Sequence, residues 1–436
     1  MDGPSRKHPS IWIPSIMDRI ARFLPLNEVV CSLRVVDKAT AAMLRSPEFM
    51  TVRLSEPVPH HAFEWRWGRP GAVRDLRLAQ RRELLLCLTA ASGVTDNLAL
   101  AASFAGRMLL TSKVSKAAGQ AGQLGSCLLL KQLGCDLGGA VEGAAAGDHL
   151  ALCEELVCRQ EVRYSPVDCA CAAAKGGHVA VLDFMVSRCG DKLQRGNRNS
   201  DKWGILADVA EGCGLATLQR LTREWTDEGE EDKEAGLLRG DVLAAAAGSP
   251  TPDWRAKVEW LESQGFTRTC QAFATAVEQP DALERFAWLA QRGYPRQPSR
   301  EELQEPLVAA AETGNLEAVL FLAEGRPDSE DQAWAADAAD AAAGEGHLHV
   351  LQALHAAGWR FDAQEASRCA AAGGHLHVVA WLVETPDLGA PLDGELYRHA
   401  ARSGSVELVA WLQERDCPRP GPSGRTVFTQ QTPRRR

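Results

Sequence analysis

The sequence predicts an all-α protein built from helical hairpins that stack side by side as a solenoid. A phrase of small residues, a Gly turn and an apolar stripe, AAAGGHLHVVAWLVE at Ala370–Glu384, recurs along most of the 436 residues. Its copies lie about 26–36 residues apart, a spacing typical of repeat architectures. Each copy alone would expose too much apolar surface to be stable, so neighbouring copies must share a core.

We expect about ten repeats, because five copies of the phrase are strong and five are looser. The strong copies lie at Ala172–Met185, Ala309–Leu322, Ala341–Leu354, Ala370–Glu384 and Ala400–Leu412. The looser copies lie at Ala117–Leu130, Ala144–Leu156, Val209–Leu221, Ala244–Leu261 and Ala274–Leu289. The first apolar residue after each turn is Leu124, Leu150, Val179, Leu215, Leu283, Leu316, Leu348, Leu376 and Val406.

Each part of the phrase has a structural reason. The Ala run favours a helix, because Ala has the highest helix propensity, and its small side chains let a neighbouring helix come close. The Gly that follows can take the left-handed conformation that ends a helix. Asn315 and Asp281 stand where the second helix needs an N-cap acceptor. The second helix then presents one apolar stripe, formed in one copy by Leu376, Val379, Leu382 and Val383.

Aromatic residues recur at one position of the second helix, just before a stripe leucine. They could form a ladder for a ligand or belong to the core between repeats. We favour the core, because a buried aromatic side chain contributes about 150–250 Å² of contact area. The residues are Phe184, Trp260, Trp288, Phe321, Trp381 and Trp411.

The phrase AA-x-x-G-H/N-L-x-x-V-x-x-L resembles ankyrin repeats over most of the chain. The opening Thr-Pro-Leu-His of that family is missing, and Glu395–Arg398 (ELYR) stands in its place, so we expect plain loops instead of β-hairpins between repeats. The resemblance implies that a protein target binds the repeat surface. Aromatic and arginine residues in the loops that break the repeat pattern are our candidates, because such residues often anchor interfaces. They are Tyr294, Arg296, Arg326, Trp359, Arg360 and Phe361, of which Trp359 and Phe361 could instead pack below the second helix.

The histidine pairs His347/His349 and His375/His377 are possible metal ligands by residue type. Side chains two residues apart on a helix do not face each other, which disfavours that interpretation. The first His of each pair is the turn residue of the repeat, as is His178. The ankyrin resemblance implies that it bonds backbone of a neighbouring hairpin.

Ile11–Leu44 predicts three short helices. Ile16, Ile20 and Phe23/Leu24 share a face of the first helix, Pro25 ends it, and Asn27 can cap the next. A bundle this small buries too little surface to be robust alone. To be stable it must pack against the adjoining chain or against a partner.

This segment resembles an F-box in Trp12-Ile13-Pro14, Ile20, Phe23-Leu24-Pro25, Glu28 and Leu33-Arg34-x-Val36-x-Lys38. It departs from that pattern at Ser15, Asp37 and Thr40. The resemblance implies binding to a Skp1-like subunit and so to a cullin ubiquitin ligase. The alternative is that these helices only cap the open end of the solenoid. The resemblance places the Skp1 contact at Pro14, Ile20, Leu24, Pro25, Leu33 and Val36.

A basic connector follows the amino-terminal helices. Trp65 and Trp67 bracket Arg66, and this pattern could form a phosphate-binding patch with stacking aromatics. We favour two Trp rings that anchor the cap to the first repeat, with arginines that reach outward. The further arginines are Arg69, Arg74, Arg77, Arg81 and Arg82.

The chain therefore divides into a disordered segment at 1–9, an F-box-like domain at 10–48, a connector and cap at 49–88, a solenoid at 89–417 and a disordered basic tail at 418–436. The polar segments 189–201, 226–236 and 249–253 predict insertions that interrupt the repeats.

The composition disfavours several classes of partner and cellular location. A net charge of −9 disfavours nucleic acid as a partner. No apolar run reaches the roughly 18 residues of a membrane span, and MDGPSRKHPS lacks the apolar core of a secretory signal. Thirteen scattered cysteines suggest reduced thiols in a cytoplasmic or nuclear protein.

We find no motif for a metal, a phosphate loop or a catalytic group, so we expect no cofactor and no enzyme. Three functions are weighed. The first is a substrate-recruiting adaptor of a ubiquitin ligase, monomeric outside its complexes. The second is a scaffold unrelated to ubiquitin, and the third is an enzyme that carries none of the motifs sought.

Overall fold

The computed structural model describes residues 14–69, 71–74, 76, 80–105, 110–159, 162–190, 199–225, 233–296, 306–324 and 333–419. These residues form helices and loops, and no strand is found among them, as the all-α prediction requires. They fall into two compact units, residues 1–217 and 218–436. The predicted disorder at 1–9, the tail beyond residue 419, the loop 226–232 and Arg326 lie outside the described residues.

The amino-terminal helices pack around a small core of Ala21, Val29, Leu44 and Phe49. Three helices were predicted, and the second is divided into a short α-turn and a π-turn. The elements are α1 (Pro14–Phe23), α2 (Leu26–Glu28), the π-turn η1 (Val29–Leu33), α3 (Lys38–Met43), the 3₁₀ turn η2 (Pro47–Met50) and α4 (His60–Trp67).

Asn27 does not cap α2 as predicted, since it lies inside that helix and is fully buried. Its amide nitrogen donates to the carbonyl oxygens of Arg53 (2.7 Å) and Pro57 (3.0 Å), and its amide oxygen accepts from Arg53 N (2.9 Å). The side chain therefore fixes the loop at 53–57 against the amino-terminal helices.

The first unit continues with hairpins in which the first helices pack in sequence, α6 on α8, α8 on α10, α10 on α12 and α12 on α14. Small residues allow this: a Cβ on Gly143 would lie 2.1 Å from the carbonyl oxygen of Lys116. The elements are the π-helical η3 (Arg81–Cys87), α6 (Leu88–Ser92), α7 (Thr95–Ala105), α8 (Ser112–Gln120), α9 (Leu124–Gln132), α10 (Gly138–Ala146), α11 (Leu150–Cys158), α12 (Pro166–Lys175), α13 (Val179–Cys189) and α14 (Asn199–Gly212), followed by α15 (Leu215–Trp225), which contains the boundary between the units.

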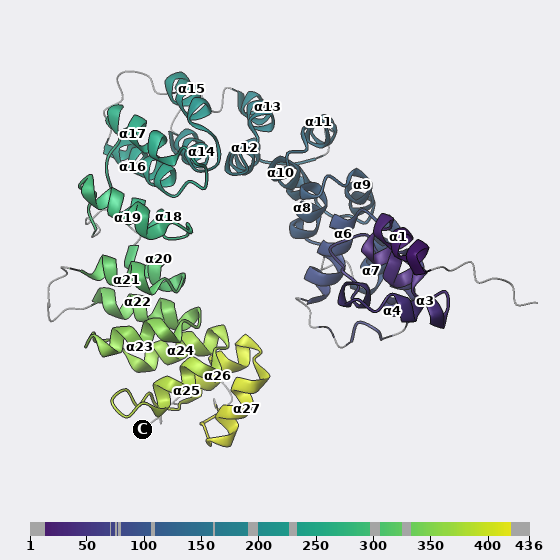
Figure 1. The fold of residues 1–436 in the computed structure, drawn as a ribbon. Helices are drawn as coiled ribbons and strands as arrows, with labels where there is room; N and C mark the ends of the chain where they lie inside the picture. The colour runs from purple at the N-terminus through teal and green to yellow at the C-terminus, as the bar shows by residue number, and fades with distance from the viewer. Residues whose placement is uncertain are drawn as a thin grey trace, which may run out of the picture. The chain divides into compact units, whose positions relative to one another are not determined.

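The second unit repeats the same arrangement from α16 to α27. Its first helices, α16, α18, α20, α22, α24 and α26, pack each on the next, and Figure 1 shows the last hairpins lying side by side in a row. The elements are α16 (Lys233–Ala247), α17 (Trp254–Ser263), α18 (Gln271–Ala276), α19 (Ala282–Gln291), α20 (Pro306–Glu312), α21 (Leu316–Ala323), α22 (Ala333–Gly344), α23 (Leu348–Ala356), α24 (Ala363–Gly373), α25 (Leu376–Glu384), α26 (Gly394–Ser403) and α27 (Val406–Glu414).

The second helices begin at the predicted residues, except that α19 begins at Ala282, one residue before Leu283. The turns before α9, α11, α13, α21, α23, α25 and α27 use the left-handed backbone, for example with Gly346 at φ 82° and Asp148 at φ 61°. Asn315 caps α21 as predicted, through a bond from Ala318 N of 3.1 Å. Asp281 makes no such cap, because its carboxylate accepts from Arg285 instead.

The apolar stripe of the second helix is shifted from the predicted residues. In α25 the buried positions are Val378, Val379 and Leu382, whereas Leu376 and Val383 are only half-buried. Leu376 is the first residue of the helix, so it lies at the turn instead of above the core.

Candidate protein-binding surfaces

The outer face of α1 is apolar and exposed. Ile16, Ile20 and Phe23 are 47%, 36% and 80% exposed, whereas Met17 and Ala21 on the adjacent face are buried. Positions i, i+4 and i+7 share one face of a helix, so these three side chains form one stripe. The three residues share a face as predicted, and that face points to solvent because Met17 and Ala21 fill the core.

The residues predicted to contact a Skp1-like subunit separate into two groups. Leu24 and Leu33 pack against the core of the amino-terminal helices, so they are structural. Ile20 and Val36 are exposed, Val36 by 56%, and Pro25 is exposed at the start of α2. Pro14 begins α1. Sequence reasoning missed Phe23 as an exposed residue, because both apolar residues before Pro25 fit the same helical face.

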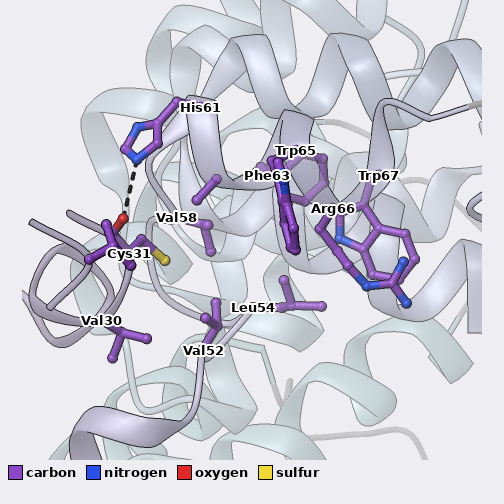
Figure 2. Close-up of a pocket in the computed structure, with 12 residues that line it drawn as sticks. Val30, Cys31, Val52, Leu54, Val58, His61, Phe63, Trp65, Arg66 and Trp67 are labelled. Atoms are coloured by element: carbon purple, nitrogen blue, oxygen red, sulfur yellow. Dashed lines mark hydrogen bonds between the residues drawn. The ribbon is translucent and has the colours of Figure 1, made fainter. Parts of the chain in front are cut away.

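An apolar groove runs between the amino-terminal helices and α4 (Figure 2), and its volume is about 710 Å³. Its entrance is marked by Trp65, which is 67% exposed and so does not anchor the cap as predicted. The side of α4 that carries Phe63 is buried, and α4 packs on α7. The groove is lined by Val30, Cys31, Val35, Val52, Leu54, Val58, His61, Ala62, Phe63, Trp65, Arg66 and Trp67.

Polar bonds hold α4 in place beside this groove. Asn97 of α7 is buried, and its amide donates to the carbonyl of Val58 (2.8 Å) while its oxygen lies 2.8 Å from His60 Nδ1. His61 Nε2 lies 3.3 Å from the carbonyl oxygen of Cys31, the bond drawn in Figure 2. The groove is therefore bounded by elements fixed on both sides.

The turn histidines join each hairpin to the one before it. Nε2 of His347 donates to the carbonyl of Glu312 (2.9 Å), and that of His178 donates to the carbonyl of Ala146 (3.1 Å). His349 makes a similar bond to Gly314 (2.9 Å). These bonds agree with the structural role that we expected for the turn residue.

The rings of His347 and His349 lie edge to face with their centroids 5.9 Å apart, contrary to the expectation that they do not meet. His347 precedes the helix and has non-helical ψ of 69°, so helical spacing does not apply to the pair. Both Nε2 atoms bond carbonyl oxygens. Among the described residues, no group of three or more His, Cys, Asp or Glu side chains could hold a metal ion.

The repeated aromatic position is half-buried, neither a fully buried core nor an open ladder. In three second helices an arginine four residues later covers the ring. Arg188 lies 5.0 Å from the centre of the Phe184 ring, Arg292 lies 4.6 Å from Trp288, and Arg415 lies 3.9 Å from Trp411. Such cation–π contacts are worth about 0.5–1 kcal/mol at exposed sites.

Some predicted target-binding residues serve the fold. Tyr294 is only 4% exposed, and its hydroxyl donates to Glu262 (2.9 Å) in the preceding hairpin. The pKa of Glu262 is lowered: burial opposes this, but hydrogen bonds from Arg292 and Tyr294 outweigh it. Tyr294 is therefore wrong as a surface anchor.

Arg296 is half-buried over the ring of Phe321, 4.1 Å from its centre. Trp359 packs edge-on against Trp334 with ring centres 4.8 Å apart, which agrees with the alternative that it packs below the helix. Arg360 is exposed and Phe361 is half-buried. Of the predicted loop residues that the structure describes, Arg360 is the one classed as exposed.

A buried polar cluster replaces the usual turn in the hairpin of α16 and α17. Arg285 is only 4% exposed, and it donates to the carbonyl oxygens of Ala247 (2.7 Å) and Ser249 (2.8 Å). Its guanidinium also lies 4.5 Å from the ring centre of Trp254. Arg285 thus makes the bond between hairpins that a turn histidine makes elsewhere, which explains the altered phrase at 249–253.

The thirteen cysteines, all within the described residues, form no disulfide, and Cys158 is exposed while the others are buried or half-buried. Burial raises the pKa of Cys127 to about 11 and that of Cys153 to about 12. A thiol with a raised pKa carries little thiolate and reacts slowly. The buried cysteines are therefore packing residues.

None of the described helices combines the length and apolar character that a bilayer crossing needs. Neither a comparison with models of known protein families nor a search of curated proteins finds a match to this chain.

Proposed function

We propose that this chain is a substrate-recruiting adaptor of a Skp1–cullin type ubiquitin ligase, with F-box-like amino-terminal helices and ankyrin-like repeats that bind a protein target. The observation that carries the proposal is the exposed apolar stripe of α1, formed by Ile16, Ile20 and Phe23. An amphipathic helix that leaves such a stripe in water is a typical partner-binding element.

The proposed roles are divided along the chain. Ile20, Phe23 and Val36 contact the Skp1-like subunit, while Leu24 and Leu33 keep the helices folded. The repeats present loops, including Arg360 and Phe361, to the target. Solenoids suit this role because their surface grows with each added repeat.

Co-purification with Skp1 tests the adaptor. The variant Ile20→Asp with Phe23→Asp places two charges on the stripe and should abolish binding without unfolding the helices, since both side chains are exposed. Arg22→Asp is the control, because Arg22 is exposed but does not belong to the stripe. In the wild type it forms an ion pair with Asp18. A folded wild-type chain that fails to bind Skp1 would remove the proposal.

A scaffold unrelated to ubiquitin is the second candidate, favoured by the bonds of Asn97 to Val58 and His60 that tie α4 to α7. In that case the amino-terminal helices serve as a cap. Deletion of residues 1–50 would then melt or aggregate the repeats, whereas an adaptor with a separable binding segment would keep them folded.

A further inference from the structure

The groove beside α4 has the composition of a docking site. Its floor is made of buried side chains, among them Val58 and Phe63, 6% and 2% exposed. Its walls carry side chains that remain in water, since Val35, Val52 and Trp65 are 69%, 41% and 67% exposed. Figure 2 shows Val52 and Leu54 across the groove from the aromatic side chains of α4. Concave apolar surface of this kind marks a binding groove.

The charges at the groove are cationic. Arg66 lies over the Trp67 ring at 4.1 Å and Arg69 over the Trp65 ring at 5.0 Å, so two guanidinium groups stand at the aromatic wall. No carboxylate lines the groove within the described residues.

A second hollow, of about 450 Å³, is lined by residues that neighbour those of the groove along the chain. Arg34 lines it next to Val35 of the groove, and Met50 lines it two residues before Val52 of the groove. Its remaining lining residues are Lys38, Ala41, Ala42 and Arg45, so the described residues bring three cations and no carboxylate to it.

One cation of the second hollow is incompletely bonded. Nε of Arg34 is buried and has no hydrogen-bond partner among the described residues. The carboxylate of Asp37, three residues further along the chain, caps α3, where it accepts from Thr40 N at 2.7 Å. Buried guanidinium nitrogens ordinarily have an acceptor, so this hollow lacks an anionic group.

We infer that the groove and the second, cationic hollow together bind an acidic amphipathic helix of a partner protein. Its apolar side chains enter the groove between α4 and the segment 52–58, and its carboxylates meet Arg34, Lys38 and Arg45. This site is separate from the α1 stripe and does not depend on the proposed adaptor function.

Fluorescence anisotropy of the full chain with a labelled helical peptide tests the inference. The probe has about twelve residues, roughly three helical turns, with Leu and Phe on one face and Glu on the other. Trp65→Ala and the pair Lys38→Glu with Arg45→Glu should each weaken binding at least tenfold. Added salt should weaken the wild type more than the double charge variant.

Two controls keep the test specific, and circular dichroism checks that every variant is folded. Phe23→Ala removes an exposed aromatic residue outside the groove and should leave peptide affinity unchanged, and a peptide with Lys for Glu should not bind. The inference is overturned if the wild type does not bind the acidic peptide, if the Lys peptide binds equally well, or if Phe23→Ala weakens binding as much as Trp65→Ala. Skp1 binding by the groove variants shows separately whether the adaptor proposal stands.

Discussion

The carboxylate of Asp393 accepts a hydrogen bond from the guanidinium of Arg368, 2.8 Å away, so the first residue of one hairpin is held by the first helix of the hairpin before it. The same carboxylate accepts from Gln364 (2.8 Å) and caps α26 through Leu396 N (2.7 Å). One side chain thus both starts a helix and joins two repeats.

Asp393→Ala should lower the free energy of unfolding by about 1–2 kcal/mol at pH 7, the usual cost of losing an N-cap. The pKa of Asp393 is lowered to about 2, because its hydrogen bonds with Leu396, Arg368 and Gln364 outweigh burial. A lowered carboxyl pKa stabilises the fold above the unfolded value and loses that contribution as pH falls toward 2. Urea denaturation of the wild type and of Asp393→Ala between pH 7 and pH 2 measures this loss of stability.

Asp393→Asn separates the two roles, since Asn can cap but carries no charge for Arg368. At pH 7 the free energy of unfolding of Asp393→Asn should lie between those of the wild type and Asp393→Ala. Equal stability of all three chains at pH 7 would contradict the coupling between the hairpins.

Asp340 on α22 predicts the opposite pH dependence. Burial, followed by repulsion from Glu365, Asp337 and Asp362, raises its pKa to about 6. A raised carboxyl pKa means that the folded chain holds the proton longer, so stability falls as pH rises from about 4 through 6. Asp340→Asn should stabilise the chain at pH 7 by about 1 kcal/mol, a figure reduced for solvent screening of a half-exposed group.

The gain from Asp340→Asn should vanish near pH 4, where the wild-type carboxyl is protonated. Glu345→Gln is the control, because Glu345 is exposed directly after the same helix and does not contribute to the raised pKa of Asp340. Thermal melts at several pH values make the comparison, and a stabilisation that does not change with pH would refute the argument.

The repeat phrase predicts the hairpins closely because Gly turns, Ala runs and apolar stripes are local signals. Helices α21, α23 and α25 begin at the residues predicted for them. The exposure of Phe23 and Trp65 and the burial of Tyr294 depend on packing between segments distant in sequence. Periodicity shows which residues share a face, but not whether that face meets another element.

In α25, the cost of truncating the half-buried Trp381 can be compared with that of truncating the fully buried Leu382. Leu382 is fully buried, so Leu382→Ala should cost about 2–5 kcal/mol of unfolding free energy. Trp381 is half-buried, with its ring centre 5.9 Å from that of His355 on the preceding hairpin. Its truncation to Ala should cost about 2 kcal/mol, less than for a buried Trp. Denaturant titration would disprove the assignment if Trp381→Ala cost more than Leu382→Ala.

Thiol accessibility tests the packing of the repeats as a whole. In the folded chain one cysteine, the exposed Cys158, should react rapidly with a thiol reagent, whereas all thirteen should react after denaturation. Cys369 is half-buried and its pKa is raised to about 11 by burial, then by Asp340 and Glu365. At pH 8 it is about 0.1% thiolate, so its reaction should be slow and rise about tenfold for each pH unit. Cys158→Ser should remove the fast phase and Cys369→Ser should leave it intact. A fast phase that survives Cys158→Ser would show that another hairpin opens to solvent.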